Sequence, residues 1–543
     1  MKLIKIKLTK TITSIVFVFF IFLLSACNLQ HNKHGKPNIL FIIADDLGYY
    51  DLSCTGSNYY ETPNIDRIAR EGMMFTEGYA NCQVCSPSRA SIMTGKFPAR
   101  HGITDHLGAR SGKEWRTWGR HSKLLPPEYL HNLPHEYMVL PEALKEAGYK
   151  TFMAGKWHLG IKGSWPTDHG FDINKGGWEV GSPRSGYFVP WKNPNLKDGP
   201  EGENLSLRLA RETANFIKQN KDTSFFAYLS FYAVHGPVQT TKEKWSKYRQ
   251  KAEDAGIAET GFKMGHFLPI RQEQDNPVYA GLVETMDDAV GIVLKALDET
   301  GLADNTIVIF TSDNGGVVSG DDYSTSNKPL RAGKGNQFEG GIKEPYFIKI
   351  PWMEGGCTCG TPVIGTDFYP TILELVGEKP KPDEHVDGVS LVPLLEGGTI
   401  AKRDLIWHYP HYGNQGGMPS SIIRSGNWKL IHYYEDDHEE LYNLETDISE
   451  TTDLSKDYQN LVQELNEQLF SFLKEVNARF PQKDPEYDEG EEKEYLKSIE
   501  YKRMPRLEKE RLNFLSNKFD PGNNWWGSMV ANGDSLAYEF SMD

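Results

Sequence analysis

Acidic and amide side chains follow two apolar segments of this sequence. Asp45 and Asp46 come directly after the run at 38–44, and Asp313 with Asn314 follows a second such run. Carboxylate and amide oxygens are hard ligands, which suit Ca²⁺ better than Zn²⁺. Two adjacent carboxylates cannot point the same way from a regular strand, so we expect Asp45 and Asp46 to lie where a strand turns into a loop. The pattern predicts a site for one calcium ion.

A set of cations and histidines stands in other segments, beside the ends of apolar runs or next to glycines. Its members are Arg89, Lys156, His158, His235 and Lys334. A single surface lysine or arginine is usually only solvated, and a single histidine is more often structural. Glycine-containing loops, however, let the backbone approach a ligand closely. Together with a divalent cation, these residues would form one positive pocket for an anionic group.

Segment 85–95 reads Cys-Ser-Pro-Ser-Arg-Ala-Ser-Ile-Met-Thr-Gly. Cys-x-Pro-x-Arg followed by a helix and Thr-Gly resembles the type I sulfatases, in which this cysteine is oxidised after translation to formylglycine. Further landmarks of that family occur in the expected order: Asp45-Asp46, Gly155-Lys156-Trp157-His158, His235-Gly-Pro, Asp313-Asn314-Gly, and Gly333-Lys334 followed by Glu339-Gly-Gly. The resemblance covers residues 36–480. It implies an alkaline phosphatase-like fold and the hydrolysis of sulfate esters.

The resemblance also implies a role for each residue. Cys85, as formylglycine, completes the calcium sphere, and the hydrated aldehyde has two hydroxyls. One attacks sulfur and releases the alcohol, and the other collapses the sulfated intermediate to the aldehyde and frees sulfate. Arg89 and Lys156 contact the formylglycine hydroxyls and sulfate, and His158 assists the collapse. Lys334 binds sulfate, and His235 and Lys334 both lie near the leaving oxygen. We expect His235 to be the general acid. A formylglycine-generating enzyme is an implied partner.

Alternating strands and helices must position these residues. Continuous apolar runs at 38–44, 224–230 and 306–311 are typical of strands buried on both faces of a parallel sheet. Helical patterns lie between them at 64–71, 88–94, 141–147, 205–219 and 279–300. This order predicts an α/β fold with a large doubly wound mixed sheet flanked by helices. In such sheets ligands bind beyond the carboxyl ends of the strands, where the polar clusters fall.

After about residue 380 the pattern changes. Short strands at 404–409, 420–424, 428–434 and 439–442, followed by an amphipathic helix at 458–480, predict a smaller α+β domain with a short antiparallel sheet. Residues 483–511 are rich in charge and are predicted to be a solvated extension, before a tail with two tryptophans at 523–527. The predicted division is a signal at 1–26, a linker at 27–36, a catalytic domain at 37–380, a C-terminal α+β subdomain at 381–482, and an extension and tail at 483–543.

The N-terminus has the layout of an export signal. Four lysines precede an apolar run at 15–24, which is too short to span a bilayer as a helix. The tetrad Leu24-Ser25-Ala26-Cys27 resembles the bacterial lipobox, in which the cysteine is lipidated and becomes the mature N-terminus. A plain cleavable signal with an incidental cysteine is the alternative. We expect an exported bacterial lipoprotein that is anchored to a membrane through Cys27.

The other cysteines carry less information. Six cysteines in 543 residues do not make a disulfide scaffold. Cys82-x-x-Cys85 lacks a second His/Cys pair at zinc-site spacing, so we do not expect structural zinc. The pairing of Cys54, Cys82, Cys357 and Cys359 stays open.

The net charge of −15 argues against a nucleic-acid or general polyanion binder, because such proteins carry a basic face. Loss of the four signal lysines would take the charge to −19. We therefore expect recognition of a single terminal sulfate, not long-range capture of a sulfated chain.

Aromatic and polar loops at 163–191 and 407–417 suit carbohydrate, with His408, His411 and Arg424 as candidate specificity residues. The predicted function is exo-acting desulfation of sulfated oligosaccharides from ulvan, carrageenan or glycosaminoglycan. The alternatives are a phosphodiesterase or phosphonate hydrolase of the same superfamily, and a catalytically silent glycan-binding lipoprotein.

Overall fold

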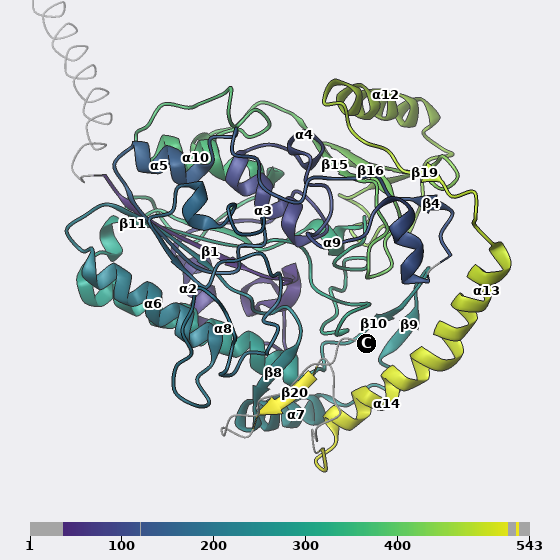
Figure 1. Cartoon of the computed structure of the whole chain (residues 1–543), viewed down its shortest axis with the longest axis horizontal. Coiled ribbons are helices and arrows are strands. Elements are labelled where there is room, and N and C mark those ends of the chain that lie inside the picture. The colour runs from purple at the N-terminus through teal and green to yellow at the C-terminus, as the bar shows by residue number, and fades with distance from the viewer. Residues whose placement is uncertain (1–35, 120, 520–527, 532–543) are drawn as a thin grey trace, which may run out of the picture.

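A computed structural model describes residues 36–119, 121–519 and 528–531 (Figure 1). The predicted signal, Cys27 and the tail at 523–527 lie outside the described residues. Within the described ranges, no helix combines the length and the apolar character needed to cross a bilayer. The cysteines whose pairing the sequence left open all carry free thiols: Cys54, Cys82, Cys357 and Cys359.

The centre of the molecule is an eight-stranded mixed sheet. The strand order is β13-β2-β12-β11-β1-β7-β5-β6. The bounds are β1 Asn38–Ala44, β2 Met73–Phe75, β5 Lys150–Gly155, β6 Ile173–Lys175, β7 Phe225–Ser230, β11 Thr306–Ser312, β12 Tyr346–Lys349 and β13 Cys357–Cys359. Strand β1 pairs in parallel with β11 and β7, whereas β11 pairs antiparallel with β12. Every residue of β1, β7 and β11 is buried, which confirms the predicted two-sided burial.

Helices cover both faces of this sheet (Figure 1). One face packs against α2 Pro63–Glu71, α6 Leu205–Gln219 and α8 Pro277–Thr300, and the other against α3 Cys85–Thr94, α5 Leu140–Glu146 and α10 Phe368–Leu375. Alternate residues of β1 separate the two cores: Leu40 and Ile42 face the first set, and Ile39 and Phe41 face the second. The predicted doubly wound α/β fold is confirmed.

A smaller antiparallel sheet follows, as predicted. It consists of β15 Asp404–Tyr409, β16 Ser420–Ser425, β17 Trp428–Tyr433 and β18 His438–Asn443. Helix α12 Gln459–Glu475 buries Leu465, Leu469 and Leu473, which recur every four residues, in the same core as this sheet.

The described ranges contain further helices and strands. The helices are α4 Pro98–His101, α7 Lys242–Ala255, α9 Glu339–Ile342 and α11 Val392–Leu395. The strands are β3 Gly78–Tyr79, β4 Leu124–Leu125, β8 Val238–Thr241, β9 Phe262–Met264, β10 Pro269–Arg271, β14 Val363–Ile364, β19 Gln482–Lys483 and β20 Ser528–Ala531.

The prediction of a solvated extension is wrong for the later part of segment 483–511. Helix α13 Glu489–Ser498 buries no residue, but α14 Met504–Leu515 packs on the body. The buried Arg511 places Nε 2.6 Å from Asp275 Oδ2. Trp245 Nε1 donates to the carbonyl of Phe514 at 2.9 Å. The charge-rich composition conceals buried positions at helical spacing, Leu507, Arg511 and Phe514.

A buried ion cluster fastens the small sheet to the catalytic body. Lys429 of β17 is fully buried, and its Nζ lies 3.0 Å from Glu339 Oε1 and 2.7 Å from Glu450 Oε1. Glu339 opens α9, five residues after Lys334, and its Oε2 accepts a hydrogen bond from Tyr79 Oη at 2.7 Å. The small sheet therefore fixes the segment that carries Lys334.

Replacing Lys429 with methionine should destabilise the protein by about 3–5 kcal/mol, because two buried carboxylates lose their shared cation. The midpoints of thermal and urea unfolding measure this. Lys295→Met is the matched control, since the Lys295 side chain is 76% exposed and its loss should cost no more than about 0.5 kcal/mol. Equal midpoints for the two variants would show that the cluster does not stabilise the fold.

Candidate active site

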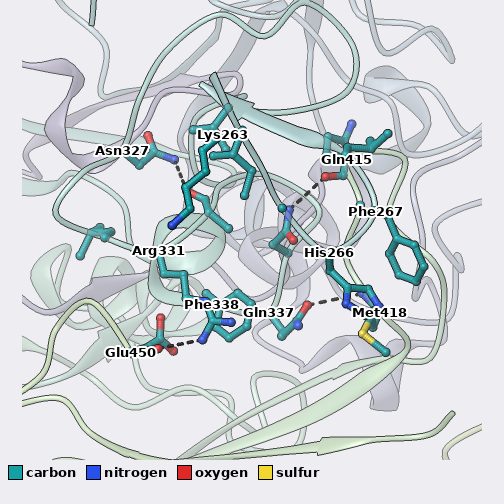
Figure 2. A pocket seen from close by; sticks show the side chains of 18 of the residues that line it. Lys263, His266, Phe267, Asn327, Arg331, Gln337, Phe338, Gln415, Met418 and Glu450 are labelled. Atoms are coloured by element: carbon teal, nitrogen blue, oxygen red, sulfur yellow. Dashed lines mark hydrogen bonds between the residues drawn. The ribbon is translucent and has the colours of Figure 1, made fainter. Parts of the chain in front are cut away.

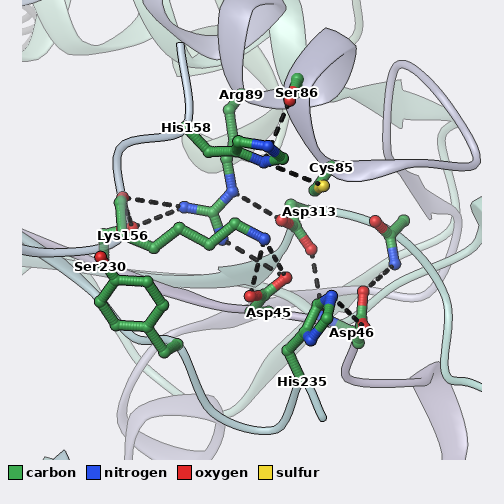
Figure 3. Close-up of polar contacts among 12 residues, drawn as sticks. Asp45, Asp46, Cys85, Ser86, Arg89, Lys156, His158, Ser230, His235 and Asp313 are labelled. Atoms are coloured by element: carbon green, nitrogen blue, oxygen red, sulfur yellow. Dashed lines mark hydrogen bonds and ion pairs between the residues drawn. The ribbon is translucent and has the colours of Figure 1, made fainter. Parts of the chain in front are cut away.

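Three carboxylates meet beyond the ends of β1 and β11 (Figure 3). One oxygen from each of Asp45, Asp46 and Asp313 lies within 4.8 Å of the others, and all three residues are buried. Strand β1 ends at Ala44, and Asp46 adopts a left-handed backbone with φ of 64°. The expectation that the acidic pair lies where the strand becomes a loop is confirmed. The backbone N–H of Asp46 donates to Asp313 Oδ1 at 3.1 Å, which holds the two loops together.

The chemistry of this donor set fits a hard divalent cation. Asn314 donates from Nδ2 to Asp46 Oδ1 at 2.9 Å, whereas its buried Oδ1 has no hydrogen-bond partner. A buried acceptor without a partner is costly, and so is a group of adjacent buried carboxylates. A calcium ion would satisfy both, since it binds carboxylate and amide oxygens.

Burial and neighbouring charges set the pKa values of this cluster. Burial raises the pKa of Asp45 well above its usual range, although Lys156 opposes the shift. Burial would also raise the pKa of Asp46, but Lys334 and His235 lower it below the usual range. The carboxylates thus compete for positive charge, and a divalent cation would favour the ionised form of both.

Each acid also has its own basic partner. Lys156 Nζ lies 2.8 Å from both oxygens of Asp45, and Lys334 Nζ lies 2.7 Å from Asp46 Oδ2. Arg89 Nε donates to Asp313 Oδ2 at 2.6 Å, whereas its buried Nη2 has no hydrogen-bond partner. The site therefore contains a buried cationic donor that a bound anion would satisfy.

Close strand packing positions Lys156. A Cβ on Gly155 would lie 1.7 Å from the carbonyl oxygen of Ser230, so β5 and β7 approach as only glycine allows. The N–H of Lys156 donates to that carbonyl at 2.8 Å. The hydroxyl of Ser230 in turn accepts from Arg89 Nη1 at 2.6 Å.

Cys85 is the first residue of α3, at an end where unpaired N–H groups favour negative charge. The helix ends at Thr94, and Gly95 takes a left-handed φ of 64°, which explains the glycine of the Thr-Gly pair. Burial raises the pKa of the Cys85 thiol, against the effect of Lys156 and Lys334. The unmodified thiol is therefore neutral at physiological pH and a poor nucleophile.

His158 faces this thiol. Its Nδ1 lies 3.4 Å from Cys85 Sγ and 3.1 Å from Ser86 Oγ (Figure 3). Its Nε2 donates to the carbonyl of Leu107 at 3.2 Å, which leaves Nδ1 of the neutral ring as an acceptor. Burial, followed by the charge of Lys156, lowers the pKa of His158 well below its usual range. The ring is thus neutral and directed at residue 85.

His235 stands on the other side of the acids. Its Nδ1 donates to the carbonyl of Gly236 at 2.8 Å, and its Nε2 lies 3.7 Å from Asp46 Oδ2. Burial, followed by the charge of Lys334, lowers the pKa of His235 to about 4. The structure thus brings together the predicted catalytic and metal-binding residues, which come from segments spread over 290 positions of the chain.

Cys85, His158, His235 and Lys334 line a cavity of about 610 Å³. It is also lined by polar residues that the sequence did not single out: His106, His131, Glu179, Arg184 and Asp321. Asn414 and Gln415 belong to the glycine-rich turn of the predicted polar loop at 407–417. Gln415 also borders a second cavity of about 850 Å³, which the β9–β10 hairpin and the small sheet enclose (Figure 2).

The prediction that His408, His411 and Arg424 contact substrate needs correction. All three are buried, and none lines the catalytic cavity. His408 Nδ1 pairs with Ser421 Oγ at 2.7 Å, and His411 Nε2 pairs with Thr104 Oγ1 at 2.8 Å. Arg424 donates to Glu77 Oε2 at 2.8 Å and contacts the ring of Tyr79. The contacts of His411 and Arg424 reach the catalytic body, whereas His408 pairs within the small sheet, across β15 and β16.

Comparisons with known proteins agree with this geometry. A sulfatase family model matches residues 37–378, and a model of the C-terminal part of N-sulphoglucosamine sulphohydrolase matches residues 333–476. A sulfatase of Formosa agariphila is 31% identical over 535 residues, which cover 84% of this chain and 92% of that protein. Human N-acetylgalactosamine-6-sulfatase is 33% identical over 403 residues and 68% of each chain.

Solved structures give the same result. The crystal structure of Ps i-CgsB superposes with a TM-score of 0.66 at 28% identity, and the match covers 87% of this chain and all of that one. Its complex with k-i-k-neocarrahexaose superposes with a TM-score of 0.65. On its sequence, its fold and the geometry of its site, the chain belongs to the type I sulfatases of the alkaline phosphatase-like superfamily and is a sulfuric ester hydrolase.

Proposed function

We propose that this enzyme removes single terminal sulfate groups from carbohydrate oligosaccharides, with one calcium ion and with Cys85 converted to formylglycine. The observation that carries the chemistry is the position of the buried Cys85. Its Sγ lies 3.4 Å from His158 Nδ1, and basic residues surround the buried acidic cluster beside it. Two similarities support a carbohydrate substrate. One relative is an N-acetylgalactosamine-6-sulfatase, and Ps i-CgsB has been crystallised with a neocarrahexaose. The cavity is lined by hydrogen-bonding side chains that suit a sugar.

Each basic residue has a distinct task in this proposal. Calcium would be held by Asp45, Asp46, Asp313 and Asn314, and it would stabilise negative charge on sulfate while formylglycine supplies the attacking hydroxyl. Lys156, Lys334 and Nη2 of Arg89, which has no hydrogen-bond partner, surround sulfate oxygens and neutralise the charge that builds up on them. These donors are already fixed by buried ion pairs, so little reorganisation is needed when substrate binds.

Two histidines move protons. The Nδ1 lone pair of His158 faces residue 85, where it can accept a proton during collapse of the sulfated intermediate. Nε2 of His235 faces the acidic cluster, and we assign it the proton that the departing sugar oxygen needs. A pKa of about 4 keeps His235 neutral before substrate binds, but a bound anionic sulfate favours the protonated ring.

The net charge of −15 supports an exo mode of action. The positive groups of the site are buried and paired, so a long polyanion would meet a mainly acidic exterior. We further propose export of the chain, anchoring through lipidated Cys27 and maturation by a formylglycine-generating enzyme.

Release of inorganic sulfate from defined sulfated oligosaccharides tests the function. Parallel rates on nitrophenyl sulfate and nitrophenyl phosphate esters distinguish it from a phosphodiesterase or phosphonate hydrolase. Mass spectrometry of the peptide that contains residue 85 tests the conversion of thiol to aldehyde. Faster hydrolysis of the phosphate ester, or a fully unmodified thiol in an active preparation, would contradict the proposal.

His235→Ala should separate good from poor leaving groups. We expect kcat/KM for a sulfated sugar to fall by about 10²–10⁴-fold, because an alkoxide leaves slowly without a general acid. For a nitrophenyl sulfate kcat/KM should fall far less, because nitrophenolate can leave without a proton. His121→Ala, at a partly exposed histidine outside the catalytic cavity, should leave both rates unchanged. Equal losses on the two esters would reject His235 as the general acid.

A further inference from the structure

One histidine on the wall of the catalytic cavity has no role in the reaction proposed above. His106 lines the same cavity as Cys85, His235 and Lys334. The next residue, Leu107, is joined to the nucleophile region on both sides of its peptide unit. Its N–H donates to Ser86 Oγ at 3.1 Å, and its carbonyl accepts from His158 Nε2 at 3.2 Å. His106 is therefore held within one residue of contacts that surround the reacting centre.

A buried carboxylate fixes the orientation of this ring. His106 Nδ1 lies 3.0 Å from Oδ1 of Asp105, whose side chain is 2% exposed. Asp105 Oδ1 also accepts from the Tyr409 hydroxyl at 2.9 Å and from the backbone N–H of His106 at 2.7 Å. The carbonyl of His106 accepts from the Tyr129 hydroxyl at 2.7 Å, so the backbone is fixed as well.

These contacts determine what the ring offers to a ligand. Asp105 Oδ1 accepts hydrogen bonds from the Tyr409 hydroxyl and from the backbone N–H of His106, and both stabilise the ionised carboxylate. An ionised carboxylate accepts hydrogen bonds, and Nδ1 of His106 must therefore donate. In the neutral ring, Nε2 then carries a lone pair, and the side chain is 27% exposed. Such an acceptor pairs with a hydroxyl, whereas sulfate oxygens have no proton to donate.

We propose that Nε2 of His106 accepts a hydrogen bond from a free hydroxyl of the sugar that carries the cleaved sulfate. His106 is thus a specificity residue, and Asp105 is the positioning residue that fixes its tautomer. The inference rests on the proposed function, because it requires a carbohydrate substrate. A site built to bond one hydroxyl discriminates strongly against analogues that lack it, since its polar group is then left unpaired.

The test compares sulfate esters with and without sugar hydroxyls. The substrates are 4-nitrophenyl sulfate, the monosulfated hexose or N-acetylhexosamine that wild type hydrolyses fastest, and the monodeoxy analogues of that sugar. For His106→Ala we expect kcat/KM on the sugar to fall by about 10–100-fold, with 4-nitrophenyl sulfate changed by less than about twofold. One deoxy analogue should be hydrolysed equally by wild type and variant.

Asp105→Asn provides a second variant at the same contact. The asparagine amide can donate to Nδ1 and so favour the other tautomer, which presents an N–H from Nε2. We expect kcat/KM of this variant to fall for the sulfated sugar but not for 4-nitrophenyl sulfate. Unfolding midpoints of both variants show whether the fold is kept. The inference would be overturned if kcat/KM fell equally for the sugar ester and the aryl ester. It would also be overturned if wild type and His106→Ala showed the same relative kcat/KM values over all the deoxy analogues. A wild type that hydrolyses aryl sulfate but no sulfated sugar overturns the carbohydrate proposal as well.

Discussion

Cys85→Ala will lower kcat/KM for every sulfate ester by about 10³–10⁶-fold, the scale on which enzymes lose activity with their nucleophile. Alanine has no sulfur or oxygen from which an aldehyde can be made, so neither the attack nor the collapse step has its hydroxyl. The buried cations that we propose to hold sulfate, Lys156, Lys334 and Arg89, remain in place. Substrate should therefore still bind, and the loss should fall mainly on kcat.

Cys82→Ala is the matched control. Cys82 lies three residues earlier, is also buried, and packs with Val84 and Tyr409 without itself lining the catalytic cavity. Both variants shorten one small buried side chain to a methyl group, so they share a similar cost in packing, and their difference reports the chemistry of residue 85. Initial rates, sulfate release and unfolding midpoints are the measurements. A Cys85→Ala enzyme that kept a tenth of wild-type activity would rule out residue 85 as the nucleophile.

The central sheet could be predicted because the sequence of each strand alone shows that the strand is buried. Strands buried on both faces need continuous apolar runs. Strand β1 is apolar from Ile39 to Ala44, directly before Asp45, and β11 is apolar from Ile307 to Phe310. Where such a run ends, polar residues mark the carboxyl edge, and Asp45 and Asp313 meet there. Short sequence motifs further predicted the helix that follows Cys85 and the loops that carry Lys156 and Lys334.

The rest depends on contacts between distant segments. Asp105 and His106 are an unremarkable polar pair in sequence, and their orientation comes from Tyr409, 304 positions away. His408 and Arg424 were expected at a sugar because polar side chains near aromatics suit both roles. In the structure His408 pairs with Ser421 on the neighbouring strand β16, and Arg424 pairs with Glu77 of the catalytic body, 347 positions away. Composition likewise hid α14, because charged residues surround its few buried positions.

Calcium should raise the thermal stability of the wild-type enzyme, and EDTA should reverse the effect. A ligand that binds only the folded state stabilises it by about 2.7 kcal/mol when its free concentration is a hundred times Kd. Asp313→Asn should abolish this response, because it removes one of three buried carboxylates that lie within 4.8 Å of one another. Activity should fall by about 10³-fold, since the charge that holds sulfate oxygens is lost with the ion.

Asp51→Asn is the control that makes the calcium response interpretable. Asp51 is also fully buried, but it accepts hydrogen bonds from the hydroxyls of Tyr279 at 2.7 Å and Thr325 at 2.6 Å, outside the acidic cluster. Both substitutions can lower the unfolding midpoint by themselves, and Asp313→Asn also leaves Arg89 without its nearest carboxylate. The shift produced by calcium, and not the absolute midpoint, is therefore the quantity to compare. Retention of the full shift in Asp313→Asn, or its loss in Asp51→Asn, would contradict a calcium site made from Asp45, Asp46, Asp313 and Asn314.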